Sequence, residues 1–439
     1  MKYTAINIGP IVDTLGLARG PRDLWAASYM FSLLMEKIVA KLKDAGFEVI
    51  SPAQGEKNKE IGLYPDRAFI KNPDGKDVGK LLDGVLESFA EQLEIKKDYM
   101  NVMHVSIEEG DEKKVLMRLN HLLDCTELMK RPSKDESLKH IRRLIAAPWG
   151  LGNRAIPTIK DIARRSGDKY FHSNYICIVQ ADGDGMGKTI GSKSLGEVNA
   201  FSKGLLEKGK EACAKIEKYG GETIYAGGDD LLFLAPVVHG DRNIIELLVD
   251  LDKTYGNINM SFGLSITYHR YPLYEALKAA RELLFAKAKE VDGKHAIAWC
   301  LRKHSGSGFE GTLQMDSGVY KAFDDLMKVS SEDNQISAIA YKLRANEVLL
   351  DIVRQSGSDR EMRINAFYDK FIDHPKSDYA KCTRELLSAL FEAFKEEKDG
   401  EKEEDEKEED KVIRTIITTL YGMLRTAKFI KGEKGDDDE

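Results

Sequence analysis

Residues 225–234 read YAGGDDLLFL, in which two glycines and two aspartates separate two apolar runs. The flanking stretches ETIYA and LLFLAP have the composition of strands buried in a sheet. Glycine and aspartate are common in tight turns, so the stretch predicts a β-hairpin closed by Gly227, Gly228, Asp229 and Asp230. An ordinary turn explains these four residues, and so does a metal site, because carboxylates are ligands for hard cations.

Alternating strands and helices surround this hairpin. The predicted elements are a strand NYICIVQAD (174–182), a helix (194–219), a strand NMSFGLSITYH (259–269), a helix LYEALKAARELLFAKAK (273–289) and a strand HAIAWC (295–300). With the hairpin they give the order β-α-β-β-α-β, in which the 259–269 segment extends a hairpin strand. This order predicts a ferredoxin-like unit, whose first strand lies antiparallel beside the third.

That topology places three carboxylates at one edge of the sheet. Asp182 ends the first strand, and Asp229 and Asp230 lie on the hairpin that meets the same edge. Converging carboxylates repel one another unless a positive charge lies between them. Magnesium or manganese is the cation that such oxygen ligands favour. Taken alone, Asp182 is also compatible with a simple strand end.

A glycine-rich loop follows the first strand and is a candidate phosphate-binding loop, formed by Gly183, Asp184, Gly185, Met186 and Gly187. Exposed backbone N–H groups in such a loop can hold a triphosphate, and Gly227 and Gly228 allow the backbone to approach closely. The lysines that would neutralise phosphate oxygens are Lys188, Lys287, Lys289 and Lys294. Two metal ions at the carboxylates would activate an attacking ribose hydroxyl and stabilise a pyrophosphate leaving group.

The rest of the chain divides into predicted domains at 1–150, 151–305 and 306–439. The first begins with a strand YTAINIG and an amphipathic helix DLWAASYMFSLLMEKIVAKLKDAG, followed by a strand FEVI; residues 76–145 have a mainly helical pattern. Prolines and glycines in AAPWGLGNRAIP indicate the first boundary. Amphipathic helices dominate the last domain.

Composition excludes several classes of protein. The chain has 439 residues, a net charge of −7 and five cysteines without a C-x-x-C pair, which argues against a zinc module or a disulfide framework and for a reducing cytoplasm. No apolar run reaches the length of a membrane span. Residues 396–411 hold 11 acidic and 4 basic residues, so this segment alone carries −7 and is predicted to be a solvated acidic loop.

Several stretches, taken together, resemble one known family. IVQADGDGMGK, IYAGGDDLLFLAP and SFGLSITYHRYPLYEALKAARELLFAKAK are similar to the GGDD palm domain of the large subunit of type III CRISPR effector complexes. GPRDLWAASYMFSLL resembles the amino-terminal region of its Cmr-type branch, subtype III-B, and YPDRAFI and IPTIKDIA are also similar to that group. The resemblance covers roughly residues 1–300 in order.

The resemblance implies an α+β protein with two ferredoxin-like, nucleotidyl-cyclase palm domains and a C-terminal helical domain. It implies a nucleotidyltransferase that uses ATP and Mg or Mn to make a cyclic oligoadenylate second messenger in antiviral defence. The implied partners are other subunits of the ribonucleoprotein complex, crRNA and target RNA. The site residues carried over are the metal-binding Asp182, Gly183, Asp229 and Asp230, the triphosphate-binding loop Gly183 to Gly187, the phosphate-contacting Lys289, and Ser261 facing the adenine.

Two departures from the family pattern and four alternative functions remain. None of the nine histidines precedes an aspartate, so no HD-type DNA cleavage is expected, and a cysteine-rich zinc element is not found in the sequence. The alternatives are AMP transfer to another small-molecule acceptor, a catalytically idle scaffold that binds crRNA and target RNA, template-directed polymerisation, and diguanylate cyclisation. Polymerisation is disfavoured because the sequence shows no clearly basic, aromatic-lined groove for a primer–template duplex. Diguanylate cyclisation is disfavoured because GGDDL differs from the usual motif of that family.

Overall fold

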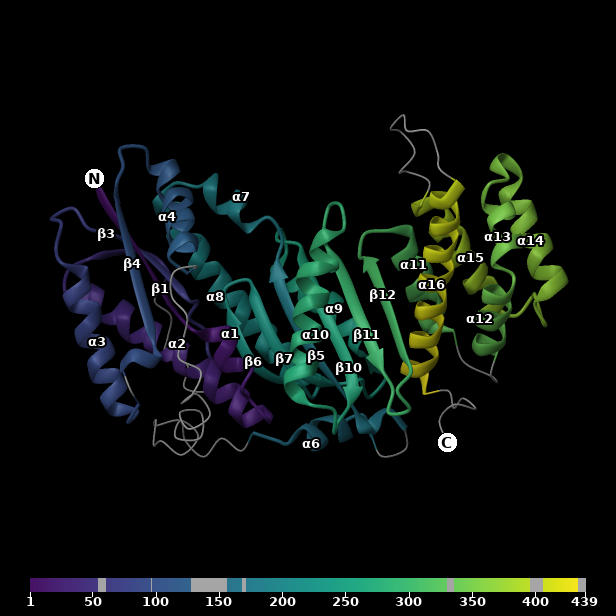
Figure 1. Ribbon diagram of the computed structural model, residues 1–439, viewed down its shortest axis with the longest axis horizontal. Coiled ribbons are helices and arrows are strands. Elements are labelled where there is room, and N and C mark those ends of the chain that lie inside the picture. Colours follow the sequence, from purple (N-terminus) through teal and green to yellow (C-terminus); the bar gives the residue numbers. More distant parts are fainter. Residues whose placement is uncertain are drawn as a thin grey trace.

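The computed structural model describes residues 1–53, 61–95, 97–127, 156–167, 171–329, 335–394 and 406–432. They form three units in a row (Figure 1): a four-stranded sheet with its helices, a six-stranded sheet with its helices, and a set of C-terminal helices. No helix in these ranges is both long and apolar enough to cross a bilayer. The α+β class and the helical C-terminal region agree with the prediction. The predicted boundary near residue 150 lies outside the described ranges.

The N-terminal unit begins with the predicted strand and long helix. Its elements are β1 (Lys2–Gly9), α1 (Ile11–Leu15), α2 (Pro21–Asp44), β2 (Glu48–Ser51), β3 (Arg67–Lys71), α3 (Val78–Gln92), β4 (Asn101–Glu108) and α4 (Glu112–Glu127). The strand order is β2-β3-β1-β4, with every neighbouring pair antiparallel. Strand β4 corrects the mainly helical prediction for 76–145. It is an edge strand in which only Ile107 is buried, and the prediction overlooked the alternation of Met103, Val105 and Ile107 that is typical of a strand.

The central unit contains the hairpin. Its main elements are α6 (Ile159–Arg164), β5 (Tyr175–Gly183), α7 (Met186–Gly191), α8 (Leu195–Lys218), β6 (Glu222–Gly227), β7 (Asp230–Pro236), α9 (Ile244–Tyr255), β10 (Met260–Tyr268), α10 (Leu273–Ala286), β11 (Ala296–Arg302) and β12 (Gly308–Gln314). A short two-stranded ribbon, β8 (Val238–His239) and β9 (Arg242–Asn243), precedes α9. The sheet order is β12-β11-β10-β5-β7-β6.

The β-α-β-β-α-β unit is present, but its second half differs from the prediction. It consists of β5, α8, β6, β7, α9 and β10, and β5 pairs antiparallel with both β7 and β10. The fourth strand is therefore the 259–269 segment, and α10 with β11 extends the sheet by a parallel strand beside β10. Helix α9 was not predicted. Asn243 begins it with a capping box to Glu246, and Gly256 ends it, which are local signals that the sequence does contain.

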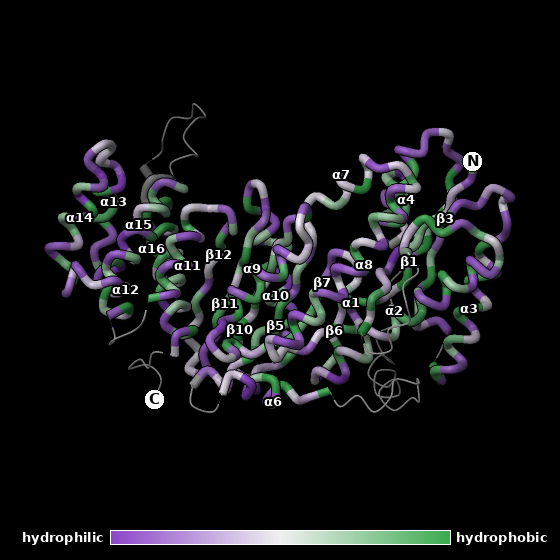
Figure 2. Tube along the Cα trace, turned by 180° about the vertical axis from the view of Figure 1, so that it is seen from behind, coloured by the Kyte–Doolittle hydropathy of each residue, from purple (hydrophilic) through white to green (hydrophobic). Residues whose placement is uncertain are grey.

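Both faces of the central sheet are covered, which explains the continuous apolar runs in its strands. On one face, alternate residues of β5 such as Cys177 and Val179 pack with α8 and α9. On the other, Ile176 and Ile178 share a cluster with α10 and with α2 of the N-terminal unit. Figure 2 shows hydrophobic residues along the strands of both sheets, whereas many connecting loops are hydrophilic. The shared cluster joins the two sheet units through one apolar core.

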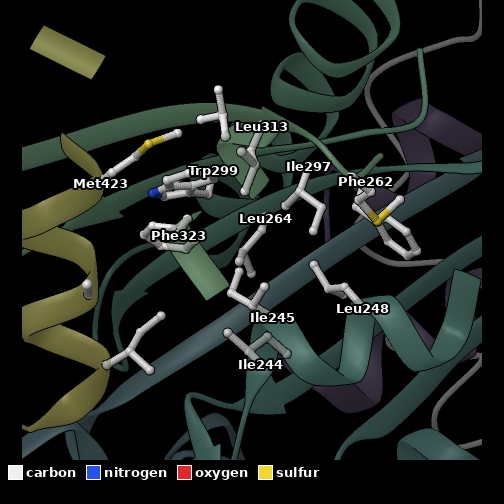
Figure 3. Close-up of a cluster of buried hydrophobic side chains, with 14 of the residues drawn as sticks. Ile244, Ile245, Leu248, Phe262, Leu264, Ile297, Trp299, Leu313, Phe323 and Met423 are labelled. Atoms are coloured by element: carbon white, nitrogen blue, oxygen red, sulfur yellow. The ribbon is translucent and has the colours of Figure 1, made fainter. Parts of the chain in front are cut away.

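The C-terminal helices pack beside β12, the edge strand of the central sheet. They are α11 (Gly318–Lys328), α12 (Gln335–Ala345), α13 (Glu347–Arg354), α14 (Arg360–Phe371), α15 (Asp378–Ala393) and α16 (Glu406–Lys431). Trp299 of β11 lies among Phe323 of α11, Met423 of α16 and Leu313 of β12 (Figure 3). Its indole N–H donates to Thr426 Oγ1 at 3.0 Å. This buried tryptophan fixes the helices against the sheet.

The predicted acidic loop at 396–411 is only partly a loop. Residues 406–411 form the first turns of α16 and extend the predicted C-terminal helix toward its N-terminus, which corrects that part of the prediction. Residues 396–405 lie outside the described ranges.

The contact between Trp299 and Gly311 gives a stability prediction. A Cβ atom at Gly311 would lie 2.2 Å from the Trp299 ring, so Gly311→Ala should force the ring to move and destabilise the protein by about 1–3 kcal/mol. Gly308→Ala is the matched control on the same strand, because its nearest contact would be an ordinary 3.7 Å. Urea unfolding followed by tryptophan fluorescence measures both. Equal midpoints for the two variants would contradict this packing.

Candidate functional site

The hairpin turn lies beside the carboxyl end of β5, as the topology predicts. Ala181 of β5 pairs with Leu231 of β7, so the next position along each strand brings Asp182 opposite Asp230. Gly227 pairs with Asp230, which leaves Gly228 and Asp229 as the two central residues of the turn. Gly228 has φ +75°, the left-handed conformation that the first central position requires. The two aspartates thus lie at the sheet edge where β5 ends.

Gly183 allows the turn to approach β5 closely. A Cβ atom at Gly183 would lie 2.9 Å from both Cβ and Oδ2 of Asp229, a separation that a side chain could not tolerate. The Gly183 backbone N–H donates to the Asp229 carboxylate. Gly227 is restricted in the same way, because an added Cβ would meet the Tyr225 hydroxyl. These glycines are therefore needed for the close approach of the turn to β5.

The hairpin carboxylates lie in a strongly negative environment. Burial, with a contribution from the charge of Asp66, raises the pKa of Asp229 to about 6. Burial and the charges of Asp229 and Asp66 raise the pKa of Asp230 to about 8, against the opposing effect of Arg281. A cation placed at this edge would relieve the repulsion and favour the ionised carboxylates.

Asp182 is paired with Lys289, which follows α10 in the short 3-10 turn Ala288–Glu290. The Lys289 ammonium donates to Asp182 Oδ2 and, at 3.1 Å, to the Gly183 carbonyl oxygen, and it lies 3.8 Å from Asp184 Oδ1. Burial, followed by the nearby charge of Lys294, lowers the pKa of Lys289 to about 8. An ammonium group thus already lies among the oxygens at the end of β5.

The predicted phosphate loop divides into a buried part and an exposed part. Asp184 points inward: its Oδ2 accepts from Ser261 Oγ at 2.8 Å and from the His295 backbone N–H at 2.9 Å. Gly185 has φ +68° and precedes α7, where Gly187 and Lys188 are exposed. The exposed part therefore keeps backbone and ammonium groups accessible to a ligand.

Ser261 has a different place from the expected one. Its side chain is completely buried. Its hydroxyl donates a hydrogen bond to Asp184 Oδ2 and accepts one from the Ala296 backbone N–H. It therefore lies behind the loop and supports it instead of facing a ligand.

The predicted phosphate-binding Lys294 is exposed. Its backbone has a left-handed conformation with φ +56°, next to His295.

His295 is a site residue that the sequence reasoning missed. Its Nδ1 lies 2.7 Å from Asp316 Oδ2 and its Nε2 lies 3.1 Å from Asp252 Oδ2. Burial lowers the pKa of this imidazole, but the hydrogen bonds and charges of Asp252 and Asp316 outweigh burial and raise it above the ordinary value. His295 thereby connects the loop that follows β5 with the end of β12. A single histidine beside a predicted strand gave no sequence signal for this role.

The N-terminal unit completes the site. A cavity of about 230 Å³ is lined by Gly228, Asp229 and, from the N-terminal unit, Tyr64. A second cavity, of about 170 Å³, is lined by Asp230 and by Asp66. Asp66 was missed as a site residue, although it lies in the stretch YPDRAFI. The hairpin therefore lies between two cavities that both units form.

The residues fit a divalent cation only in part. Within the described ranges, no group of three or more His, Cys, Asp or Glu side chains is arranged to hold a metal ion. Asp229 and Asp230 adjoin each other with raised pKa values, as expected for a site that favours a cation. Asp182 is instead turned toward Lys289. Asp229, Asp230 and Asp182 could hold the ion if the ammonium of Lys289 withdrew.

Comparison with known proteins gives two family matches in chain order. Residues 3–95 match the model of CRISPR-associated protein Cmr2, N-terminal, and residues 175–298 match Cas10/Cmr2, second palm domain. The CRISPR system Cmr subunit Cmr2 of Pyrococcus furiosus is 32% identical over 165 residues, which cover 30% of this chain. The match spans 19% of that relative's length.

Solved structures share the fold at low sequence identity. A type III-B Cmr-beta structure in the apo state has a TM-score of 0.61 and 11% identity, covering 84% of this chain and 77% of that one. The Csm1-Csm4 cassette in complex with AMPPNP has a TM-score of 0.58 and 14% identity, covering 98% and 70%. At such identity, these likenesses concern the fold alone.

The raised pKa of Asp230 gives a pH-dependent prediction. An unfolded aspartate ionises near pH 4, whereas folded Asp230 resists ionisation up to about pH 8, so its charge costs stability as the pH rises through this window. Asp230→Asn should therefore stabilise the metal-free protein at pH 8, on the order of 2 kcal/mol, and much less at pH 5.

Thermal unfolding in EDTA at the two pH values measures this difference. Asp241→Asn is the control, because Asp241 is an exposed aspartate in the turn of the β8–β9 ribbon, which follows the end of β7 opposite to the hairpin. An equal effect of Asp230→Asn at pH 5 and pH 8 would contradict the electrostatic account.

Proposed function

This chain belongs to the Cas10/Cmr2 family of type III CRISPR large subunits, and on that premise we propose that it is a metal-dependent nucleotidyltransferase acting on ATP. The observation that carries the proposal is the Asp229–Asp230 turn, held against the end of β5 between two cavities. A turn with only a structural role has no need for adjacent carboxylates with raised pKa values.

The aspartates and the lysines of the site would have different roles. Asp229, Asp230 and Asp182 would hold Mg²⁺ or Mn²⁺, with the Gly183 carbonyl oxygen at the same edge. The bound ion would supply positive charge near the attacking hydroxyl and the leaving pyrophosphate. Lys289, released from Asp182, would neutralise phosphate oxygens, and exposed Lys188 and Lys294 would add to that charge.

The loop Gly183–Gly187 would orient the triphosphate through its backbone N–H groups. In the reaction, a ribose hydroxyl oxygen forms a bond to the α-phosphorus of ATP as the bond to pyrophosphate breaks, and the hydroxyl proton passes to solvent or a nearby base. The buried bonds from Ser261 and His295 to Asp184 keep this loop in one conformation. Preorganisation of that kind lowers the cost of positioning the substrate.

The proposed product is a cyclic oligoadenylate. Support comes from solved Csm1-Csm4 cassettes, which share the fold and were obtained in complex with one ATP, with pppApA, with cA3 and with cA4. AMP transfer to another small-molecule acceptor uses the same aspartates and is the alternative. A catalytically idle scaffold is less well supported, because the hairpin keeps both carboxylates.

We further propose that the chain works within a type III complex in cytoplasmic antiviral defence and that target RNA triggers its activity. Two structural relatives motivate this proposal: Cmr-beta was obtained bound to cognate target RNA, and Csm1 was obtained with Csm4 in an interference complex. The corresponding partners here are other subunits of the complex, crRNA and target RNA.

Removing both hairpin carboxylates tests the proposal. Asp229→Ala with Asp230→Ala should abolish product formation, by at least about 1,000-fold, because the cation loses its principal ligands. The assay incubates the assembled complex with labelled ATP, Mg²⁺ or Mn²⁺, target RNA and a metabolite extract, and identifies products by mass spectrometry. Asp241→Ala is the control.

The products separate the alternatives. Adenylate rings lost in the double variant would support the messenger synthase, whereas an AMP adduct lost in that variant would keep the site and change the acceptor. Products that survive the double change would contradict the proposed site, and no aspartate-dependent product under any condition would favour the scaffold.

Lys289 should affect nucleotide binding more than turnover. Lys289→Ala removes one ammonium from the phosphate region and should raise KM for ATP about tenfold, in the range expected for a charge-assisted hydrogen bond. Lys278→Ala, an exposed lysine on α10, is the matched control. Steady-state kinetics on the assembled complex measures both, and an unchanged KM for Lys289→Ala would remove this residue from the site.

A further inference from the structure

A third cavity, larger than the two beside the hairpin, lies away from the aspartate edge. It has a volume of about 840 Å³ and opens where β12 meets the helical domain. Its walls are the start of β12, the junction of α12 with α13, and one face of α16. Strand β12 begins at this cavity and ends beside His295, where Met315 N–H donates to the His295 carbonyl oxygen at 2.8 Å. Seven residues of strand separate the two places by roughly 20 Å.

The cavity wall is held in place by backbone packing. A Cβ atom at Gly422 of α16 would lie 2.2 Å from the Glu310 carbonyl oxygen of β12, so the helix backbone rests directly on the strand. Arg414, Tyr421 and Arg425 project from the same face of this helix, since they are spaced by seven and four residues. The cavity is therefore a preformed groove between two rigid elements, β12 and α16.

Arginine side chains and aromatic rings are layered along this groove. The Arg344 guanidinium carbon lies 5.0 Å from the centroid of the Tyr421 ring. The Arg425 guanidinium carbon lies 4.9 Å from the Phe309 ring centroid and 5.8 Å from that of Tyr421. A guanidinium that lies over a ring keeps its N–H edges directed outward, where they can contact phosphate oxygens.

The groove is more positive than the chain around it. Three arginines line it together with two glutamates, Glu310 and Glu347. Glu310 is neutralised by Lys287, whose Nζ lies 2.5 Å from its Oε2, and Glu347 lies 3.7 Å from Arg414. Within the described ranges, no carboxylate forms an ion pair with Arg344. In a protein with a net charge of −7, this is a distinct basic patch.

We propose that this groove binds a short single-stranded nucleic-acid segment, with phosphates on Arg344, Arg414 and Arg425 and bases stacked on the rings of Phe309 and Tyr421. Cationic side chains interleaved with flat aromatic surfaces are the combination by which proteins hold single strands without reading their sequence. An acidic peptide would use the arginines but would have no use for the two rings. The volume accommodates about two nucleotides, on the scale of ordinary ligand cavities.

Fluorescence anisotropy with the full chain tests the proposal. The probes are 5′-fluorescein-labelled ten-nucleotide RNA and DNA of mixed sequence in 50 mM salt, and the variant is Arg344→Glu with Arg414→Glu. The double charge reversal should raise the dissociation constant of the RNA at least about tenfold. Both residues are exposed, so the fold should persist, and Arg344→Gln with Arg414→Gln removes the charges more gently.

Two controls localise the binding. Arg363→Glu reverses an exposed arginine of α14 outside the groove and should leave the dissociation constant unchanged. Asp229→Ala with Asp230→Ala should also leave it unchanged, which separates this groove from the proposed nucleotidyltransferase site. Tyr421→Ala should weaken binding at least about fivefold, since it removes a stacking surface.

Each outcome decides the proposal. Equal loss for RNA and DNA would assign the groove to single strands in general, and a larger loss for RNA would restrict it to RNA. No binding of either probe, or binding insensitive to the arginine changes, would overturn the proposal. Binding of a labelled glutamate-rich peptide that requires the arginines, without oligonucleotide binding, would also overturn it and make the groove a protein-docking surface.

Discussion

The antiparallel pairing of β5 with β7 is the constraint on which the site depends. It brings the end of one strand against a turn some 47 residues later, and the pair Ala181–Leu231 fixes the register that places Asp182 opposite Asp230. The contact of Gly183 with Asp229 then sets how closely the carboxylates approach. A shift of one residue would direct the aspartates to the other face, so the apolar runs that fix the register also position the site.

The three aspartates at this edge of the sheet reduce their mutual repulsion in two different ways. Burial raises the pKa of Asp229 and Asp230, whereas Asp182 is neutralised by the ammonium of Lys289. Under the proposed function, a cation bound at the hairpin would replace the ammonium of Lys289 beside Asp182, and the lysine would then be available to phosphate. Asp66 would make this exchange depend on the N-terminal unit, because its charge contributes to the raised pKa values of Asp229 and Asp230.

The sequence predicted the hairpin because its glycines and aspartates separate two apolar runs. It predicted the β-α-β-β-α-β order from the succession of strand and helix patterns, and that topology places Asp182 beside the turn. The sequence reasoning assigned the wrong second helix, because it did not use the capping box of Asn243 with Glu246 or the terminating Gly256 that delimit α9. It missed β4 because the alternating Met103, Val105 and Ile107 lie in a short stretch between two helical patterns. It missed Asp66 and His295 because their roles arise only from contacts between distant segments. Ser261 was placed toward the ligand, but only the three-dimensional fold reveals that it is buried behind Asp184.

The proposed function requires that the hairpin aspartates bind a divalent cation. Electron paramagnetic resonance of Mn²⁺ titrated into the full chain with AMPPNP measures bound ion directly and without turnover. We expect at least one bound Mn²⁺ in the wild type and its loss in the variant with Asp229→Asn and Asp230→Asn. The same number of bound ions with the same affinity in that variant would rule out a cation site at the hairpin.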